Sequence, residues 1–412
     1  MIVQRLGSRP QEGAEQIGLR PQLELMGKYQ LGLKSMMENL KLPVTSAAEA
    51  AMLANLDTAA GTGFDKLHMV PLYAELAGGE KAVATIDALP ETEQGRVRAL
   101  LRAIYQDNAT LAEEDRDFLV ARLGWFGELA LTWGQPQDAQ RLKLMDNARS
   151  TFLAVFAFAG LVFLMGFAGL ALLVTILARA YLGKRPQCRF PVPDARHPGH
   201  RAWLESFALF LLIFLGLPFL APLLPFDATP LSLLMLLAPL WLALRGFGVR
   251  EIAVKLGLHP GAGLFREIGS GLVGYLAGIP IVFCGFMLTF ALMKLSGEQP
   301  VHPVIFEFDE AGTSKLLGIF VLACVLAPLM EEIIFRGVFY QYLRAHLNPF
   351  LAATLCGLVF AAIHPQGWVA IPVLASIGAV FALLREWRGS LIANMMLWAT
   401  SSGAIAILNW SK

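Results

Sequence analysis

APLMEEIIFRGVFY, residues 327–340, is an apolar run that contains two adjacent carboxylates, Glu331 and Glu332, followed by Arg336. In a soluble protein such a run is usually a core helix or the end of a helix. Inside a membrane the same charges are costly, and they then indicate a function. The composition and the segments around this run distinguish the two cases.

The composition is that of a membrane protein. The chain has 412 residues, of which 56% are hydrophobic and 16% are charged, and its mean hydropathy is +0.56. Soluble domains carry about a quarter charged residues. The formal net charge is +1 and there is no basic stripe with interleaved aromatic residues, so we expect no nucleic-acid partner.

The chain divides near Ser150 into two predicted domains, residues 1–149 and residues 150–412. The first has apolar residues at helical spacing among charged ones, which predicts a soluble α-helical domain. Within it, PLYAELAGGEKAVATIDAL (71–89) predicts two helices joined by a Gly-Gly turn. This pattern is compatible with tetratricopeptide-like helical hairpins and equally with a plain helical bundle.

The second domain consists mainly of apolar segments of about the 20 residues that cross a bilayer. The predicted fold class is therefore all-α: a polytopic membrane helical bundle of about eight spans, preceded by the soluble helical domain. The predicted spans are Thr151–Ala178, Trp203–Leu224, Leu231–Leu244, Ile268–Leu295, Leu316–Phe339, Phe350–His364, Val369–Leu384 and Leu391–Leu408.

Charges between the spans predict an orientation. Basic segments such as Arg179–Arg201 and REWRGS (385–390) are expected on the cytoplasmic side, and the acidic loop 296–315 on the other. The same rule places residues 1–149 outside, although no apolar signal segment opens the chain. The side of the N-terminal domain therefore stays open.

The acidic pair is predicted to lie near the middle of a membrane helix. Helical character extends from Leu316 to about Leu347, a length of about 45 Å, against about 30 Å for the hydrocarbon core. Glu332 and Arg336 are four residues apart on one helix face, so they can form a structural ion pair. Glu331 projects about 100° away from Glu332. The ion pair of Glu332 and Arg336 therefore gives no reason for a carboxylate at position 331.

His364 is the predicted partner of Glu331. It closes the apolar run CGLVFAAIH (356–364), and Asn348 and Pro349 mark a turn between the two helices. Glu331 and His364 stand almost equally far from this turn along the chain, so antiparallel helices would bring them to the same depth. His364 alone would be a helix-terminal residue at an interface, and the depth match favours a functional pair.

A carboxylate beside a histidine in an apolar environment can act as a general base. Desolvation favours the protonated carboxyl, and the histidine can share that proton, so the two can activate water for attack on a carbonyl. Zinc is the alternative, but HExxH is absent and a catalytic zinc normally has three protein ligands. Glu332 would have to leave Arg336 to be the third, so the sequence disfavours zinc and indicates no other cofactor.

At these residues the chain resembles the CAAX-protease and bacteriocin-processing (CPBP, Abi) family of glutamate-type intramembrane proteases. EEIIFRG (331–337) matches the family signature EExxxR, and FAAIH (360–364) matches FxxxH at the usual separation. LGLHPGAG (256–263) and GSL (389–391) also look like the family, and the resemblance covers Arg245 to Trp410. It implies an eight-helix membrane fold with a conical polar cavity, and cleavage of a peptide bond near the C-terminus of a substrate.

The resemblance also implies roles for individual residues. Glu331 matches the glutamate that activates water, and His364 matches the first family histidine. Glu332 and Arg336 match the residues that support them.

The third family signature is altered. Trp398 and Ser402 stand where the family has the His and Asn that bind the substrate carbonyl, and Asn394, one turn earlier, is a further candidate for the cavity wall. Trp398 and Ser402 can each donate one hydrogen bond, so they are candidates for a weakened oxyanion site. Losing one such donor costs about a hundredfold or more in rate.

Three functions are compatible with these features. The first is an intramembrane peptidase that cuts near a substrate C-terminus with a water activated by Glu331 and His364. The second is a catalytically impaired pseudoprotease, a membrane scaffold that binds peptide tails. The third is a transporter with an internal proton-binding carboxylate, but no repeat between halves supports it.

The expected location is the bacterial inner membrane, as an integral multi-pass protein. The expected partners are membrane lipid, the C-terminal tail of a peptide or protein as substrate, and a protein that binds the N-terminal helical domain.

Overall fold

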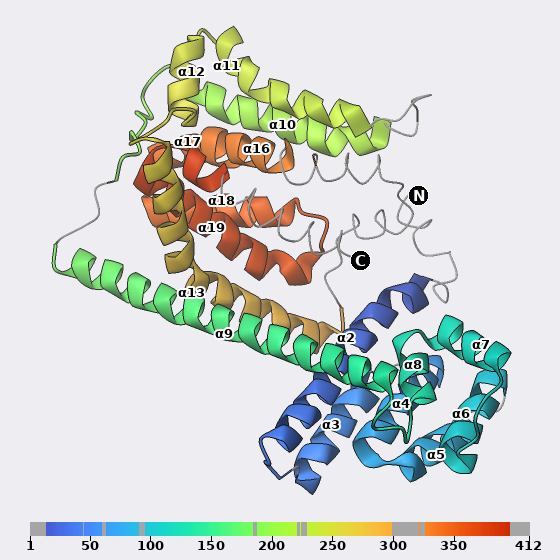
Figure 1. Ribbon diagram of the computed structural model, residues 1–412. Coiled ribbons are helices and arrows are strands. Elements are labelled where there is room, and N and C mark those ends of the chain that lie inside the picture. Colours follow the sequence, from blue (N-terminus) through green and yellow to red (C-terminus); the bar gives the residue numbers. More distant parts are fainter. Residues whose placement is uncertain are drawn as a thin grey trace. The chain divides into compact units, whose positions relative to one another are not determined.

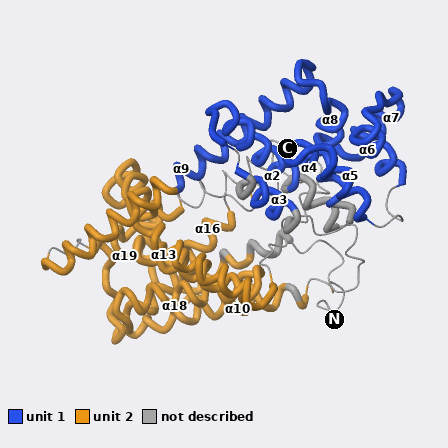
Figure 2. The backbone as a smooth tube through the Cα atoms, turned by 90° about the horizontal axis from the view of Figure 1, so that it is seen from below, with its two compact units in different colours: residues 1–162 blue, residues 163–412 orange. Residues whose placement is uncertain are grey.

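The structure is a computed structural model that describes residues 14–43, 45–59, 63–89, 95–183, 188–220, 223, 229–298, 321 and 326–395. It is 81% helical and has no strand among the residues described, which confirms the predicted all-α class. The chain separates into two compact units, residues 1–162 and residues 163–412 (Figure 2). The division lies inside helix α9 (Ala139–Tyr181), C-terminal to the predicted boundary at residue 149.

Unit 1 is a set of helices packed around α4 (Figure 1). Met69, Val70 and Leu72 of α4 are fully buried, and this helix contacts α2, α3, α5, α6 and α8. Burial of these apolar side chains stabilises the packing of α4 against its neighbours. The helices are α2 (Ala14–Asn39), α3 (Ser46–Ala59), α4 (Gly63–Ala77), α5 (Gly79–Ala88), α6 (Gly95–Asp107), α7 (Glu113–Leu123) and α8 (Trp125–Leu131).

The turn between α4 and α5 forms where the Gly-Gly sequence predicts it. Helix α4 ends at Ala77, Gly78 has φ +89°, and α5 begins at Gly79. Glycine adopts a positive φ without strain because it has no Cβ. The two helices pack against each other as a hairpin. Their likeness to tetratricopeptide repeats stays a prediction.

Helix α9 begins in unit 1 and continues as an apolar segment. Leu144, Ala148 and Phe152 are buried in unit 1, whereas Phe163 and Phe167 further along are exposed. Large apolar side chains exposed on one continuous helix are stable in lipid and not in water. With 43 residues the helix extends about 65 Å, enough for a membrane span and a soluble part.

Unit 2 contains the remaining helices (Figure 1). Helix α19 is at its centre, because α13 and α18 both pack along it. The elements are α10 (Arg201–Leu220), η2 (Thr229–Leu240), α11 (Trp241–Leu244), α12 (Val249–Leu256), α13 (Leu264–Ser296), α16 (Ala327–Glu331), η4 (Glu332–Phe339), α17 (Tyr340–His346), α18 (Pro349–Ala362), η5 (Trp368–Ala370) and α19 (Ile371–Arg388).

Three of the described helical segments are long and apolar enough to cross a membrane: Ala139–Tyr181, Leu264–Ser296 and Trp368–Arg388. The predicted number of about eight spans is therefore not confirmed. Much of the predicted spans Leu316–Phe339 and Leu391–Leu408 lies outside the described residues. The predicted short span Leu231–Leu244 is mostly the 3₁₀ helix η2, which contains Pro239.

Two glycines allow α18 and α19 to approach closely. A Cβ on Gly357 would lie 2.3 Å from the Ala375 carbonyl oxygen, and a Cβ on Gly378 would lie 2.7 Å from the Gly357 Cα. Small residues at such contacts let backbones approach, which stabilises helix pairs in membranes. This contact matters for the site because α18 carries His364 just beyond its C-terminal end.

Gly357→Ala is expected to destabilise the protein by about 1–3 kcal/mol, because the new methyl group would overlap backbone atoms of α19. Thermal unfolding in detergent measures the change. Gly216→Ala on α10 is the matched control, since a Cβ there meets nothing within 4 Å. Alanine in a helix is favoured over glycine, so the control should be neutral or more stable. Equal stabilities of the two variants would contradict the close α18–α19 contact.

Candidate active site

The helix that carries the two carboxylates changes its winding between them. Helix α16 ends at Glu331, and the next segment, Glu332–Phe339, is a π-helix that continues into α17. Pro328 opens α16 in its first turn, where the missing N–H of proline costs nothing. π-helical turns are rare and frequently mark functional sites. The spacing of apolar residues in this segment is that of an ordinary α-helix. The sequence therefore gives no direct sign of the change from α-helical to π-helical winding.

Glu331 and His364 lie together, as their depths in the two helices predict. Glu331 Oε1 is 3.8 Å from His364 Nε2, and the two side chains are 20% and 15% exposed. His364 Nδ1 is 2.6 Å from the Phe360 carbonyl oxygen. A carbonyl only accepts hydrogen bonds, so Nδ1 carries the hydrogen, and Nε2 of the neutral ring is left as an acceptor on the side of Glu331.

Glu332 and Arg336 form a fully buried ion pair. Glu332 Oε1 is 3.0 Å from Arg336 Nη1, and both side chains are 0% exposed. Arg336 Nη2 donates to the Gly378 carbonyl at 3.3 Å, and the Phe360 ring centroid lies 4.7 Å from its guanidinium carbon. Aromatic rings and hydrogen bonds offset part of the cost of burying a guanidinium.

Asn394 also binds Glu332. Its Nδ2 donates to Glu332 Oε2 at 2.8 Å and to the Phe381 carbonyl at 2.9 Å, and the residue is fully buried. Both amide hydrogens are used, so Asn394 has none left for a substrate in this conformation. Trp398 and Ser402, the other candidates for the cavity wall, lie outside the described residues.

Residues 313–403 match the family model of type II CAAX prenyl endopeptidase Rce1-like proteins. The matched segment contains the Glu331–His364 pair and the Glu332–Arg336 pair. This chain carries a domain of the CAAX-protease family. No curated protein and no solved structure gave a match.

The CAAX-protease domain and the apolar helices together make this an integral membrane protein. At the level of the family, the domain is that of a CAAX-type intramembrane peptidase.

A three-ligand metal site does not fit the residues described. Among them, no group of three His, Cys, Asp or Glu side chains is placed to hold a metal ion. Glu331 and His364 converge, but Glu332 is turned toward Arg336 and Asn394. A catalytic zinc normally has three protein ligands.

Two further ion pairs of unit 2, both largely buried, were not predicted from the sequence. Arg344 binds Glu386 through two contacts of 2.9 and 3.0 Å, and Arg388 binds Glu267 through two contacts of 2.7 and 2.9 Å. The sequence predicts that these basic residues lie in loops between the spans. The one feature that indicates an ion pair is Glu386, an acidic residue within the otherwise basic segment REWRGS.

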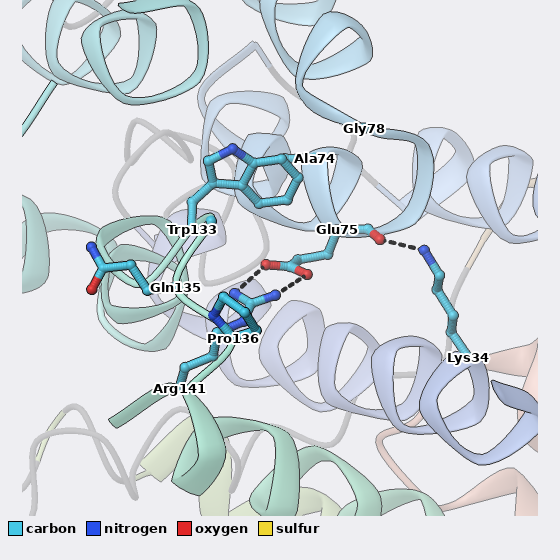
Figure 3. Close-up of a pocket in the computed structure, with 9 residues that line it drawn as sticks. Lys34, Ala74, Glu75, Gly78, Trp133, Gln135, Pro136 and Arg141 are labelled. Atoms are coloured by element: carbon cyan, nitrogen blue, oxygen red, sulfur yellow. Dashed lines mark hydrogen bonds and ion pairs between the residues drawn. The ribbon is translucent and has the colours of Figure 1, made fainter. Parts of the chain in front are cut away.

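Unit 1 contains a separate cavity of about 370 Å³, shown in Figure 3. Glu75 and Arg141 form a bidentate pair on its wall with both N···O distances 2.8 Å, and Lys34 Nζ donates to the Glu75 carbonyl at 2.6 Å. Burial, with the charge of Glu75 second, raises the pKa of the nearby Tyr105. These contacts join the end of α4 to α2 and α9, which is a structural role.

Proposed function

We propose that this protein is an intramembrane peptidase that hydrolyses a peptide bond near the C-terminus of its substrate, with a water molecule activated by Glu331 and His364. The observation that carries the proposal is the 3.8 Å separation of Glu331 Oε1 and His364 Nε2 within a CAAX-protease domain. Both atoms can bind the same water molecule at this separation.

In the proposed reaction Glu331 takes a proton from the bound water while the water oxygen attacks the scissile carbonyl carbon. His364 Nε2 accepts the second hydrogen bond of the water and orients it. The tetrahedral intermediate breaks at the C–N bond, and Glu331 returns the proton to the leaving amine. The products are a new carboxyl terminus and a short C-terminal peptide, so the atoms of water are all accounted for.

The developing oxyanion needs hydrogen-bond donors. Trp398 offers an indole N–H and Ser402 a hydroxyl, and both are proposed for this role in place of the family His and Asn. One donor of this kind contributes about a hundredfold or more in rate.

The altered third signature also favours a second candidate, a pseudoprotease that binds peptide tails without cutting them. Trp398 is larger than the histidine it replaces and would occupy part of the space for a substrate carbonyl. Tail binding by the wild type with no Glu331-dependent cleavage would support this candidate over the first.

The proposed setting is the bacterial inner membrane, which the chain crosses several times. Lipid surrounds the exposed apolar face of α9 and of α13. The substrate is proposed to be the C-terminal tail of a peptide or protein, and a protein partner is proposed for the helical unit 1.

His364→Gln is expected to lower kcat for tail cleavage by about 10²-fold, because an amide is not basic and cannot share the proton that Glu331 takes from the water. Purified wild type and variant in nanodiscs would be given a library of peptides with free C-termini, and products would be identified by mass spectrometry. His259→Gln is the control, since His259 is outside the pair and its Nδ1 accepts from the Gly261 backbone N–H. Wild-type cleavage by the His364 variant would refute this role of the histidine.

A further inference from the structure

Two adjacent carboxylates of the site have different environments. Glu331 is 20% exposed and faces His364. Glu332 is enclosed, and each of its oxygens is engaged: Oε1 lies 3.0 Å from Arg336 Nη1, and Oε2 accepts from Asn394 Nδ2 at 2.8 Å.

Asn394 joins the end of α19 to the π-helix, whose Glu332 is 62 residues away in the sequence. It lies beyond the C-terminal end of α19, it donates to the Phe381 carbonyl of α19, and it donates to Glu332 at the start of the π-helix. Only the amide nitrogen can donate to a carboxylate and a carbonyl at once, so these contacts fix the orientation of the amide. A donor to a charged acceptor in a buried site is among the stronger hydrogen bonds.

We propose that Asn394 is a positioning residue of the CAAX-protease domain: it holds Glu332 on Arg336, fixes the first turn of the π-helix, and so leaves Glu331 as the carboxylate that faces His364. This inference rests on the proposed function, in which Glu331 activates the water. Asn394 does not itself touch the water or the substrate, because it is fully buried and both its hydrogens are used.

The proposal requires an amide at residue 394. Alanine would leave Glu332 Oε2 without this donor, which removes one of the contacts that orient the carboxylate. Aspartate has the same shape but cannot donate, and its charge would face that of Glu332 at hydrogen-bonding distance. Either change acts on the orientation of the π-helix, and through it on the distance between Glu331 and His364.

The test compares kcat and KM with stability. Full-length wild type, Asn394→Ala, Asn394→Asp and the double variant Glu332→Gln/Asn394→Asp would be assayed in nanodiscs on a peptide that wild type cleaves. Asn348→Ala is the matched control: Asn348 caps α18 by accepting from the Leu351 N–H at 3.0 Å, so its loss lowers stability away from the pair.

We expect Asn394→Ala to lower kcat about tenfold or more with KM within about twofold, and Asn348→Ala to leave kcat unchanged. Asn394→Asp should be worse than Asn394→Ala. The double variant should regain about tenfold over Asn394→Asp, because the glutamine introduced at position 332 can donate to the carboxylate introduced at position 394. A kcat for Asn394→Ala equal to that of Asn348→Ala, or no recovery in the double variant, would overturn the proposal.

Failure of the proposed function has a separate signature. If Glu331→Gln cleaves as well as wild type, the water-activating role of Glu331 is wrong, and a positioning role of Asn394 falls with it. Thermal unfolding of Glu332→Gln, Asn394→Ala and the corresponding double variant then decides whether the contact exists at all. Destabilisations that are simply additive would show that Asn394 does not hold Glu332.

Discussion

Glu331→Gln is expected to lower kcat for tail-peptide cleavage by about 10³-fold or more, with little change in KM. Glutamine keeps the volume and a hydrogen-bonding oxygen, but it cannot take the proton of the attacking water. The side chain lies 3.8 Å from His364 and is partly exposed, so a substrate water can reach it. Single-turnover cleavage followed by mass spectrometry measures the rate of the chemical step.

The control for this prediction is Glu251→Gln, which changes an exposed glutamate on α12 that pairs with Lys255. It should cleave at the wild-type rate. Circular dichroism and thermal unfolding would show that Glu331→Gln is folded. Cleavage by Glu331→Gln at the wild-type rate would refute the proposed mechanism, and absence of cleavage by wild type on every tail tested would favour the scaffold function.

Arg336→Met is expected to destabilise the protein by about 3–5 kcal/mol, because it leaves the charge of Glu332 buried without its partner. The loss should be visible as a lower unfolding temperature in detergent. Adding Glu332→Gln to this variant removes the uncompensated charge, so the double variant should be more stable than Arg336→Met alone. Methionine is apolar and roughly as long as arginine without its guanidinium, so the change in packing is small.

Lys255→Met provides the comparison for a pair that water still reaches. Lys255 and Glu251 are 2.8 Å apart, but their side chains are 31% and 47% exposed. Screening by solvent limits such a pair to less than about 1 kcal/mol. Equal losses of stability in Arg336→Met and Lys255→Met would contradict the finding that Glu332 and Arg336 are shielded from water.

Local features of the fold could be predicted because neighbouring residues determine them. Gly78 ends α4 through its positive φ. Asn348 and Pro349 start α18, where Asn348 caps the helix and proline needs no N–H partner. With that turn in place, the nearly equal spacing of Glu331 and His364 from it was enough to predict their proximity.

Features that depend on distant residues could not be predicted. The side chain of Asn394 is oriented by Glu332, 62 residues away, and Arg388 is paired with Glu267, 121 residues away. No spacing rule connects such positions. The π-helical winding from Glu332 was also missed, because a single-helix pattern does not show how the surrounding helices constrain it.

The buried Glu332–Arg336 pair has a consequence for biosynthesis. A single charge placed at the centre of a membrane helix costs about 2.5–3.5 kcal/mol on insertion. The protein groups that surround this pair come later in the chain: Gly378 is 42 residues beyond Arg336, and Asn394 is 62 residues beyond Glu332. The segment that contains EEIIFR is therefore expected to leave the translocon only after α18 and α19 have been made, so these later helices act as internal chaperones for the helix that carries the charges.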